Sequence, residues 1–356
     1  MQASLAKSAL IAFVGLATVG CQYISPPGLY ERRVAAISLP QQPASTDVGF
    51  TVLTYNVEGL AWPARAGRGS RLRIIEERLS ALHAQGVAPD IVLLQEAFSR
   101  EAIAIARNSG YANVIPGPAR GDRRQLDRAE IDRDHARERN FFRGERLLGR
   151  RTHSGLYILT DLPVHAVARE PFSGRACAGF DCLSNKGVMM VRVGLPNGQT
   201  LDVFNTHFNS RRAARVDLER ADAAHRFQLE ESSIFLDRHR TIGTSAIYGG
   251  DFNMRGAPER FDPFDEAKTE FEIAHRFCAR NRDICDVALS WDGDEPWMDT
   301  QDLQIFQSSE SSLLEPVRIE AMFDEPVDGR PLSDHDGLLV TYRVRAVHPS
   351  RQGFAR

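Results

Sequence analysis

Five short polar clusters stand beside hydrophobic runs in this chain of 356 residues. Four runs end in the polar group and the fifth group precedes its run: Asn56 in TVLTYNV, Glu96 in DIVLLQE, His207 in LDVFNTHF, Asp251 and Asn253 in AIYGGDFN, and Asp334 and His335 in LSDHDGLLV. A strand end on a rigid sheet holds a side chain in place without ordering a mobile loop. A carboxylate, an amide and two imidazoles on one rim are what a hard cation and a general base require.

Each cluster alone is a weak signal, because a polar group after a strand is commonly a solvated strand end or a turn. The cluster of Asp251 and Asn253 is stronger, since Gly249 and Gly250 permit a tight turn that would lift both side chains off the sheet edge. The order of the clusters, with each at a strand end, makes the set significant as a whole.

The elements that must position these groups follow from hydrophobic periodicity. Apolar runs predict strands, and an apolar stripe at helical spacing predicts one helix at 71–83, with a second expected at 212–239. The predicted strands are 50–55, 91–95, 155–160, 188–193, 201–205, 245–249, 303–307 and 338–344. Strands and helices interleave, yet the late strands are close enough to form hairpins. This mixture indicates a layered α/β sandwich rather than a purely parallel sheet.

The ordered clusters resemble the endonuclease/exonuclease/phosphatase superfamily, whose members include deoxyribonucleases, apurinic endonucleases, inositol-phosphate phosphatases and neutral sphingomyelinases. The resemblance covers roughly residues 48–345. It implies a four-layer sandwich of two mixed β-sheets flanked by helices. It also implies that Glu96 binds a Mg²⁺ ion with help from Asn56, with Mn²⁺ as an alternative metal.

The same resemblance assigns the remaining groups. It implies that His207, Asp251 and Asn253 grip the scissile phosphate or position the attacking water. It makes His335 the general base and places Asp334 next to the metal and the phosphate.

A catalytic histidine also needs a carboxylate on its other ring nitrogen. Family members supply it from an aspartate in a strand shortly upstream of the Asp-His pair. Asp302 in TQDLQIF fits that position, and Asp299, three residues earlier, is the alternative.

The expected reaction is hydrolysis of a phosphodiester by metal-assisted, in-line attack of water. The substrate is already anionic, so a cation must offset its charge and stabilise the leaving oxygen. A neutral His335 held by Asp302 would take a proton from water near neutral pH. A protonated His207 would add a donor for the charge that develops in the transition state.

Three features favour a phospholipid headgroup as the substrate. NTHF, LSDHDGLL and NKGVMM look like the neutral sphingomyelinase branch, with Lys186 near the phosphate. The three tryptophans, Trp62, Trp291 and Trp297, lie close to the catalytic motifs, and tryptophan is favourable at a membrane-facing rim. The third feature is the exported, membrane-tethered location predicted below. Alternatively, Lys186 is a salt-bridged surface residue and the tryptophans are partly buried rim residues.

Other functions stay open for the same site. An exported nuclease would need a basic groove with stacking aromatic residues, and a phosphomonoesterase is a further option. A catalytically inactive binding module is disfavoured, because the whole set of catalytic residue types is present.

Overall charge excludes little, because a net charge of −3 gives no general attraction to nucleic acid or anionic membrane. One stretch is unusual: residues 120–151 hold eleven arginines and seven acidic residues. We expect a solvated helical insertion with many salt bridges. A lid or a phosphate-facing surface is the alternative.

The amino terminus predicts export. Residues 1–20 contain a short apolar run ending in small residues, followed by Cys21. This resembles a bacterial lipoprotein signal, in which the cysteine is lipidated and anchors the protein to the membrane. The alternative is an ordinary secretory signal and a soluble secreted protein. Residues 21–47 are expected to form a flexible tether, 48–346 a single catalytic domain acting as a monomer, and 347–356 a tail.

The other four cysteines are an even number in an oxidising compartment. The sequence allows three pairings, and the close spacings favour Cys177–Cys182 and Cys278–Cys285. A four-cysteine zinc site is the competing hypothesis, but neither pair has the two-residue spacing that zinc knuckles prefer.

Overall fold

The computed structural model describes residues 47–60, 67–124, 145, 150–174, 176–262, 271–288 and 298–347. Several sequence predictions fall outside these ranges and stay predictions: the leader, nearly all of the tether, most of the arginine-rich stretch, Cys21, Trp62, Trp291 and Trp297. None of the helices within the described ranges is both long enough and apolar enough to cross a membrane.

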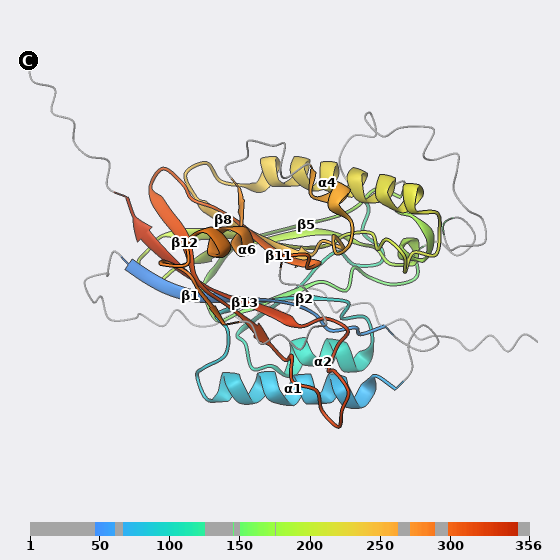
Figure 1. Cartoon of the computed structure of the whole chain (residues 1–356), viewed down its shortest axis with the longest axis horizontal. Helices are drawn as coiled ribbons and strands as arrows, with labels where there is room; N and C mark the ends of the chain where they lie inside the picture. Colours follow the sequence, from blue (N-terminus) through green and yellow to red (C-terminus); the bar gives the residue numbers. More distant parts are fainter. Residues whose placement is uncertain are drawn as a thin grey trace, which may run out of the picture.

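Two β-sheets pack face to face at the centre of the molecule (Figure 1). The seven-stranded sheet has the order β10-β12-β13-β1-β2-β4-β3. Its strands are β1 (Asp47–Asn56), β2 (Ile91–Gln95), β3 (Asn113–Pro116), β4 (Tyr157–Thr160), β10 (Asp286–Ala288), β12 (Ser312–Met322) and β13 (Gly337–Ala346). Strand β1 is parallel to β2 and antiparallel to β13, so the sheet is mixed.

The six-stranded sheet has the order β5-β6-β7-β8-β11-β9. Its strands are β5 (Val164–Pro171), β6 (Gly187–Gly194), β7 (Thr200–His207), β8 (Ser245–Asp251), β9 (Glu272–Ile273) and β11 (Asp302–Gln307). Strand β7 is parallel to β8, and β11 is antiparallel to β8. This sheet is therefore mixed as well.

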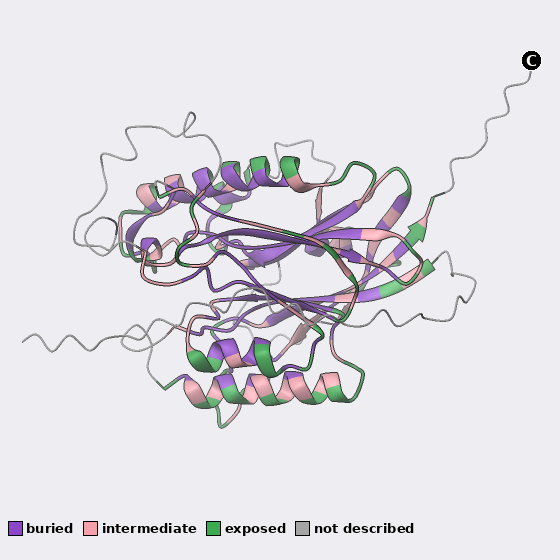
Figure 2. Cartoon of the chain, turned by 180° about the vertical axis from the view of Figure 1, so that it is seen from behind, coloured by how far each residue is buried: buried purple, intermediate pink, exposed green. Residues whose placement is uncertain are grey.

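Helices cover the outer faces of both sheets. Helices α1 (Gly69–Ala84) and α2 (Arg100–Asn108) lie on the seven-stranded sheet, and α4 (Leu218–His239) lies on the six-stranded sheet (Figure 1). The short helix α6 (Ala274–Arg280) packs against β11 and β12. Buried residues line the helix faces that meet the sheets (Figure 2). The predicted four-layer α/β sandwich is confirmed.

Three apolar clusters fill the spaces between the layers. One lies between the sheets, one beneath α1 and α2, and one beneath α4. Leu93 of β2, Val203 of β7 and Ile247 of β8 belong to the cluster between the sheets and are fully buried. Strands β2 and β4 are buried on both faces. Their sequences are therefore largely apolar runs and do not alternate between apolar and polar residues.

Polar side chains also join the two sheets within this core. Gln95 Nε2 donates to Asn205 Oδ1 at 2.8 Å, and Asn205 Nδ2 donates to the carbonyl oxygens of Leu94 and Tyr157. Gln304 Nε2 donates to the carbonyl oxygen of Val52 at 2.9 Å. Each bond links one sheet to the other, so together they fix how the two sheets, and thus their rims, sit against each other.

The helix predicted at 212–239 begins later than expected, at Leu218. Arg215 has a φ of 60°, which no helix accommodates, and Asp217 has extended backbone angles as the N-cap. Residues 208–217 therefore form a loop between His207 and α4.

Both predicted disulfide bonds are present. Cys177 and Cys182 are joined, as are Cys278 and Cys285, with sequence separations of 5 and 7 residues. The alternative of a four-cysteine zinc site is wrong, because all four sulfur atoms are used in the disulfides.

Candidate active site

The predicted site residues lie at one end of the two facing sheets. Asn56 ends β1 and pairs with Gln95 of β2, which directly precedes Glu96. His207 ends β7 and pairs with Asp251 at the end of β8. Asp251 in turn pairs with Asp302, the first residue of the antiparallel strand β11.

The loop before β13 brings His335 to the same rim. His335 Nδ1 lies 2.6 Å from Asp302 Oδ2, and both residues are buried. This short contact assigns the Nδ1 proton to the bond with Asp302, because a carboxylate only accepts. Nε2 is then left with a lone pair, as a general base requires. Asp299, the alternative partner, instead accepts from the Gly256 amide at 2.8 Å.

The carboxylate of Asp251 is the centre of the cluster. Its Oδ2 accepts from Asn56 Nδ2 at 2.9 Å and lies 3.3 Å from His207 Nε2 and 3.9 Å from His335 Nε2. Its Oδ1 accepts from the Asn253 amide at 2.8 Å. Burial raises the pKa of Asp251, while His335 and the bond from Asn56 partly offset that shift.

The glycines before Asp251 serve a purpose that the sequence did not indicate. They do not form a turn but lie inside β8, which continues to Asp251. A Cβ atom on Gly250 would lie 2.1 Å from the carbonyl oxygen of Thr206. One on Gly249 would lie 2.5 Å from Leu93 Cδ1, in the opposite sheet. The glycines thus permit close packing around β8 rather than a tight turn.

Glu96 follows β2 with a left-handed backbone conformation, φ 56°. Its Oε1 lies 4.0 Å from His207 Nε2, on the same rim. Burial raises the pKa of Glu96 to about 7, although Lys186 and His335 act to lower it. Left-handed backbone at a residue other than glycine is uncommon and concentrates at functional sites.

His207 is buried next to a lysine. Lys186 Nζ lies 3.1 Å from His207 Nε2, donates to the Phe208 carbonyl, and is paired with Asp181 Oδ1 at 2.5 Å. Lys186 is 6% exposed, so it is salt-bridged but not a surface residue. Burial, followed by the charges of Lys186 and His335, holds the pKa of His207 well below its usual value. The lowered pKa disfavours a protonated His207, so the donor beside it is Lys186, which is paired with Asp181.

Two further predicted residues reach the rim in different ways. Asn253 also has a left-handed backbone, φ 53°, and its Nδ2 donates to the Phe208 carbonyl. Asp334 is half-exposed, with Oδ1 3.9 Å from His335 Nε2. All of the catalytic and metal-binding candidates are therefore gathered at one end of the sheets, and their individual roles stay predictions.

The donor set fits a divalent cation. Within the described residues, ligand atoms of Asp251, Asp302 and His335 lie within 4.8 Å of one another. Glu96, the predicted metal ligand, lies outside this group, but its Oε1 is 4.0 Å from His207 Nε2, which is 3.3 Å from Asp251 Oδ2. The pKa values of Glu96 and Asp251 are both raised, so a cation beside them would stabilise their charged forms. Asn56 Oδ1 accepts from the Glu58 amide, so metal binding would need its second lone pair.

Three supporting residues carried no sequence signal. Ser333 Oγ donates to the Asn56 carbonyl at 2.7 Å and accepts from the His335 amide. Gln301 Nε2 lies 3.0 Å from His335 Nε2. The buried guanidinium of Arg68 donates to the carbonyl oxygens of Glu58, Val57 and Leu332, which ties the loop after β1 to the loop before His335. Isolated polar residues in loops have no periodicity to reveal them.

Solved structures share this fold. Sphingomyelinase C from Streptomyces griseocarneus superposes with a TM-score of 0.58 at 16% identity, covering 83% of this chain and 99% of that one. Beta toxin from Staphylococcus aureus gives 0.54 at 17% identity, with 82% and 99% covered. A humanized TDP2 from D. rerio gives 0.53 at 15% identity, with 84% and 99% covered. The chain has the deoxyribonuclease-like α/β sandwich that these structures share.

Sequence comparison finds similar proteins among the sphingomyelinases. No family model matches the chain. Sphingomyelinases from Mycobacterium bovis and Mycobacterium tuberculosis are 25% identical to it over 209 residues. The match covers 58% of this chain but only 34% of those relatives, so it spans about a third of their length. The chain is thus similar to sphingomyelinases both in its fold and over this partial sequence match.

Proposed function

We propose that this protein is a metal-dependent phosphodiesterase that hydrolyses the headgroup phosphodiester of a phospholipid, with sphingomyelin as the first candidate. The observation that carries the proposal is the buried pair of His335 and Asp302, 2.6 Å apart, beside the buried carboxylate of Asp251. A general base next to a cluster suited to a cation is the arrangement that attack of water on a phosphodiester requires.

Each residue of the site has a separate role in the proposed reaction. His335 Nε2 takes a proton from the attacking water, and Asp302 holds the ring and stabilises the imidazolium that forms. Lys186 places a positive charge next to His207, where it would meet a phosphate oxygen. Asn56 and the Asn253 amide hold Asp251 in place through hydrogen bonds. Mg²⁺ bound by Glu96 and Asp251 would offset the charge of the phosphate and stabilise the leaving oxygen.

The relatives support both the metal and the substrate class. A beta toxin variant from Staphylococcus aureus was solved with bound magnesium ions. The relatives found by sequence are sphingomyelinases. One of the structural neighbours, TDP2 from D. rerio, was solved with a single-stranded DNA product. Nucleic acid is therefore the second candidate substrate.

We further propose that the protein is exported and carries a lipid anchor at Cys21. The two disulfides support export, because such bonds persist in oxidising compartments. Metabolic labelling with a palmitate analogue should mark the wild type and leave Cys21→Ser unlabelled. Equal labelling of both proteins would contradict the anchor.

A substrate panel tests the proposed activity. The purified full chain is incubated with Mg²⁺ and, separately, sphingomyelin vesicles, phosphatidylcholine vesicles, plasmid DNA and 4-nitrophenyl phosphate. We expect Mg²⁺-dependent release of a phosphorylated headgroup from vesicles. Nicking of DNA without headgroup release would overturn the lipid substrate in favour of nucleic acid. Hydrolysis of the monoester alone would make the protein a phosphatase.

A further inference from the structure

Two loops meet on the rim next to the site, one carrying an exposed aromatic residue, Phe180, and the other carrying two exposed arginines, Arg212 and Arg215. The first is the disulfide loop, which contains the short 3₁₀ helix η2 (Gly179–Leu183). The second is the loop 208–217, which follows His207. Within it the Arg215 amide donates to the Arg212 carbonyl at 3.2 Å, so these arginines are the ends of one turn. The Phe180 amide donates to the Ala214 carbonyl of that turn at 3.0 Å.

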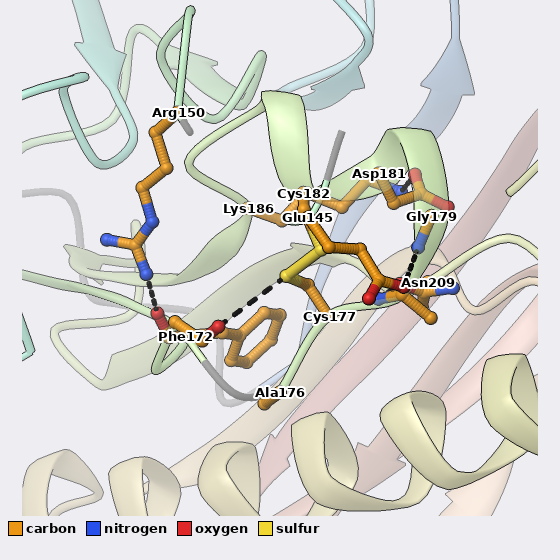
Figure 3. Close-up of a disulfide and its surroundings, with 12 residues drawn as sticks. Glu145, Arg150, Phe172, Ala176, Cys177, Gly179, Asp181, Cys182, Lys186 and Asn209 are labelled. Carbon is orange, nitrogen blue, oxygen red and sulfur yellow. Dashed lines mark hydrogen bonds and ion pairs between the residues drawn. A yellow bond between two sulfur atoms is a disulfide. The ribbon is translucent and has the colours of Figure 1, made fainter. Parts of the chain in front are cut away.

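This junction is held in place from several sides. Gly179 has a φ of 60°, and a Cβ atom there would lie 1.9 Å from the Ala214 carbonyl oxygen. The Gly179 amide donates to Glu145 Oε1 at 2.7 Å, and the bond between Cys177 and Cys182 closes the loop around it (Figure 3). Phe180 is thus presented by a loop with a fixed shape.

Neighbouring residues of the disulfide loop point in opposite directions. Asp181 reaches inward, where its carboxylate is paired with Lys186 and accepts from the Ser210 amide at 2.8 Å. Phe180 is 44% exposed and points to solvent. The disulfide loop is therefore connected to the site through Asp181, Lys186 and His207, while the side chain of Phe180 is exposed to solvent.

The exposed groups combine apolar and cationic character. Leu218, at the start of α4, is 42% exposed, and Arg212 and Arg215 are both exposed. Neither arginine forms a salt bridge within the described part of the chain, in contrast to Arg211, which pairs with Glu259 and Asp222. Exposed carboxylates follow at positions 217 and 219, so the positive charge is confined to the turn.

We propose that Phe180, Arg212 and Arg215 form an interfacial patch that docks the active-site rim onto the phosphate layer of a phospholipid bilayer. An exposed aromatic ring gains free energy at the boundary between headgroups and acyl chains. Guanidinium groups match phosphate oxygens with paired hydrogen bonds and do not need a net anionic membrane to do so. This inference rests on the proposed lipid substrate and adds the surface that presents it.

Tryptophan fluorescence in the full chain reports directly on this patch. Phe180→Trp is compared with Ile242→Trp, because Ile242 is 98% exposed and precedes β8 at the end opposite to Asp251. Vesicles of sphingomyelin, phosphatidylcholine and dibromo-phosphatidylcholine are added with EDTA, so that no turnover occurs. The wild-type emission is subtracted. We expect bromine to quench the added emission of Phe180→Trp at least threefold more than that of Ile242→Trp, whether or not an acyl anchor is present.

The arginines are tested in the same assay. Replacing both Arg212 and Arg215 by Gln should reduce the quenching of a tryptophan at position 180 at least twofold. The matched change Arg238→Gln, at an exposed position near the end of α4, should leave it unchanged. Equal quenching at positions 180 and 242 would overturn the proposal. Quenching at 180 by a single-stranded oligonucleotide, with none by brominated lipid, would overturn it in favour of a nucleic-acid surface.

Kinetics separate this proposal from the proposed function. Phe180→Ala should lower the rate on sphingomyelin vesicles about tenfold, the order expected for one buried aromatic side chain. The rate on soluble bis(4-nitrophenyl) phosphate should stay within twofold of the wild type. Selective quenching at position 180 in a protein that hydrolyses no diester would support the patch and refute the enzyme. Full diester hydrolysis without selective quenching would refute the patch alone.

Discussion

At the scale of single residues, the arrangement around His335 separates two kinds of carboxylate. Asp302 lies within hydrogen-bond distance of Nδ1, whereas Asp251 and Asp334 lie 3.9 Å from Nε2. The contact with Asp302 orients the ring, whereas Nε2 lies 3.0 Å from Gln301 Nε2, a contact that an attacking water would replace. The sequence predicted Asp302 as the partner of His335 and left Asp299 as the alternative. Only the folded structure decides between them, because it places Asp302 against His335 and Asp299 against the Gly256 amide.

Asp302→Asn should therefore lower kcat strongly while leaving the protein folded. An amide can donate to Nδ1, which would move the ring proton to Nε2 and remove the base. In a serine protease triad the equivalent change costs about 10⁴-fold, and we expect a loss of about 10³-fold or more here. Asp299→Asn is the matched control and should keep kcat within about threefold, the error of such comparisons. A folded Asp302→Asn enzyme with near-normal kcat would contradict the assigned pair.

Glu96 should make metal binding depend on pH. Burial raises the pKa of its carboxyl to about 7 in the metal-free protein, so below pH 7 a metal ion must displace a proton. The affinity for Mn²⁺, measured by titration calorimetry, should be constant above pH 7 and fall by up to about tenfold per pH unit below it. Glu96→Gln should bind more weakly, and its affinity should depend less on pH than that of the wild type. Equal affinity of the wild type at pH 5.5 and pH 7.5 would contradict the assignment.

At the scale of elements, strands were predicted better than the features that shape the rim. The run 91–95 was predicted to the residue because a strand buried on both faces is continuously apolar. Strand β12 was missed, since it alternates buried and half-exposed positions and contains Pro316 beside a register shift. The left-handed backbone at Glu96 and Asn253 has no sequence signature in the absence of glycine. The order of the motifs along the chain therefore predicted which residues lie together on the rim, but not the backbone conformation at Glu96 and Asn253.

The disulfide loop is the element that we expect to affect turnover most. Cys177 and Cys182 close the loop that carries Asp181, the partner of Lys186. Replacing both cysteines by Ser should lower kcat on a soluble diester about tenfold, because misplacing a charged group near the reaction by about 1 Å has costs of this order or more. The matched change of Cys278 and Cys285 should lower stability by about 2 kcal/mol and leave kcat unchanged. Equal kcat losses in the two double variants would contradict a local role.

At the scale of the whole molecule, the two sheets must keep their relative position because each contributes part of the site. Glu96 and His335 border strands of the seven-stranded sheet, and His207 and Asp251 end strands of the other. The buried amides of Gln95, Asn205 and Gln304 link the sheets beneath the rim. The sequence could not reveal these links, since a glutamine inside a strand looks the same whether its partner is water or the opposite sheet.

Buried histidines should make the whole fold sensitive to acid. Burial lowers the pKa of His153 to about 4 and the pKa values of His225 and His275 to about 3. The unfolded chain protonates near pH 6.5, so between these values it binds more protons than the folded state. The stability that each histidine contributes is therefore complete above about pH 6.5 and falls as the pH decreases, by up to about 1.4 kcal/mol per pH unit. The raised pKa values of Glu96 and Asp251 act in the opposite direction.

Urea unfolding at pH 5, 6 and 7.5 measures this dependence. The free energy of unfolding should fall steadily from pH 7.5 to pH 5. His225→Gln should lower stability at pH 7.5 but reduce the pH slope, whereas the change of exposed His165 to Gln should leave the slope as it is. An equal pH slope in the wild type and in His225→Gln would contradict a neutral, buried His225.

The central claim is that one metal-dependent site, with His335 as its base, cleaves a phosphodiester. The most direct measurement is the rate of hydrolysis of bis(4-nitrophenyl) phosphate by the full chain and by His335→Ala, each with Mg²⁺ and with EDTA. We predict a rate for the wild type that EDTA abolishes and that folded His335→Ala lowers by at least about 10³-fold. Hydrolysis that survives EDTA, or that a folded His335→Ala variant retains, would contradict the account.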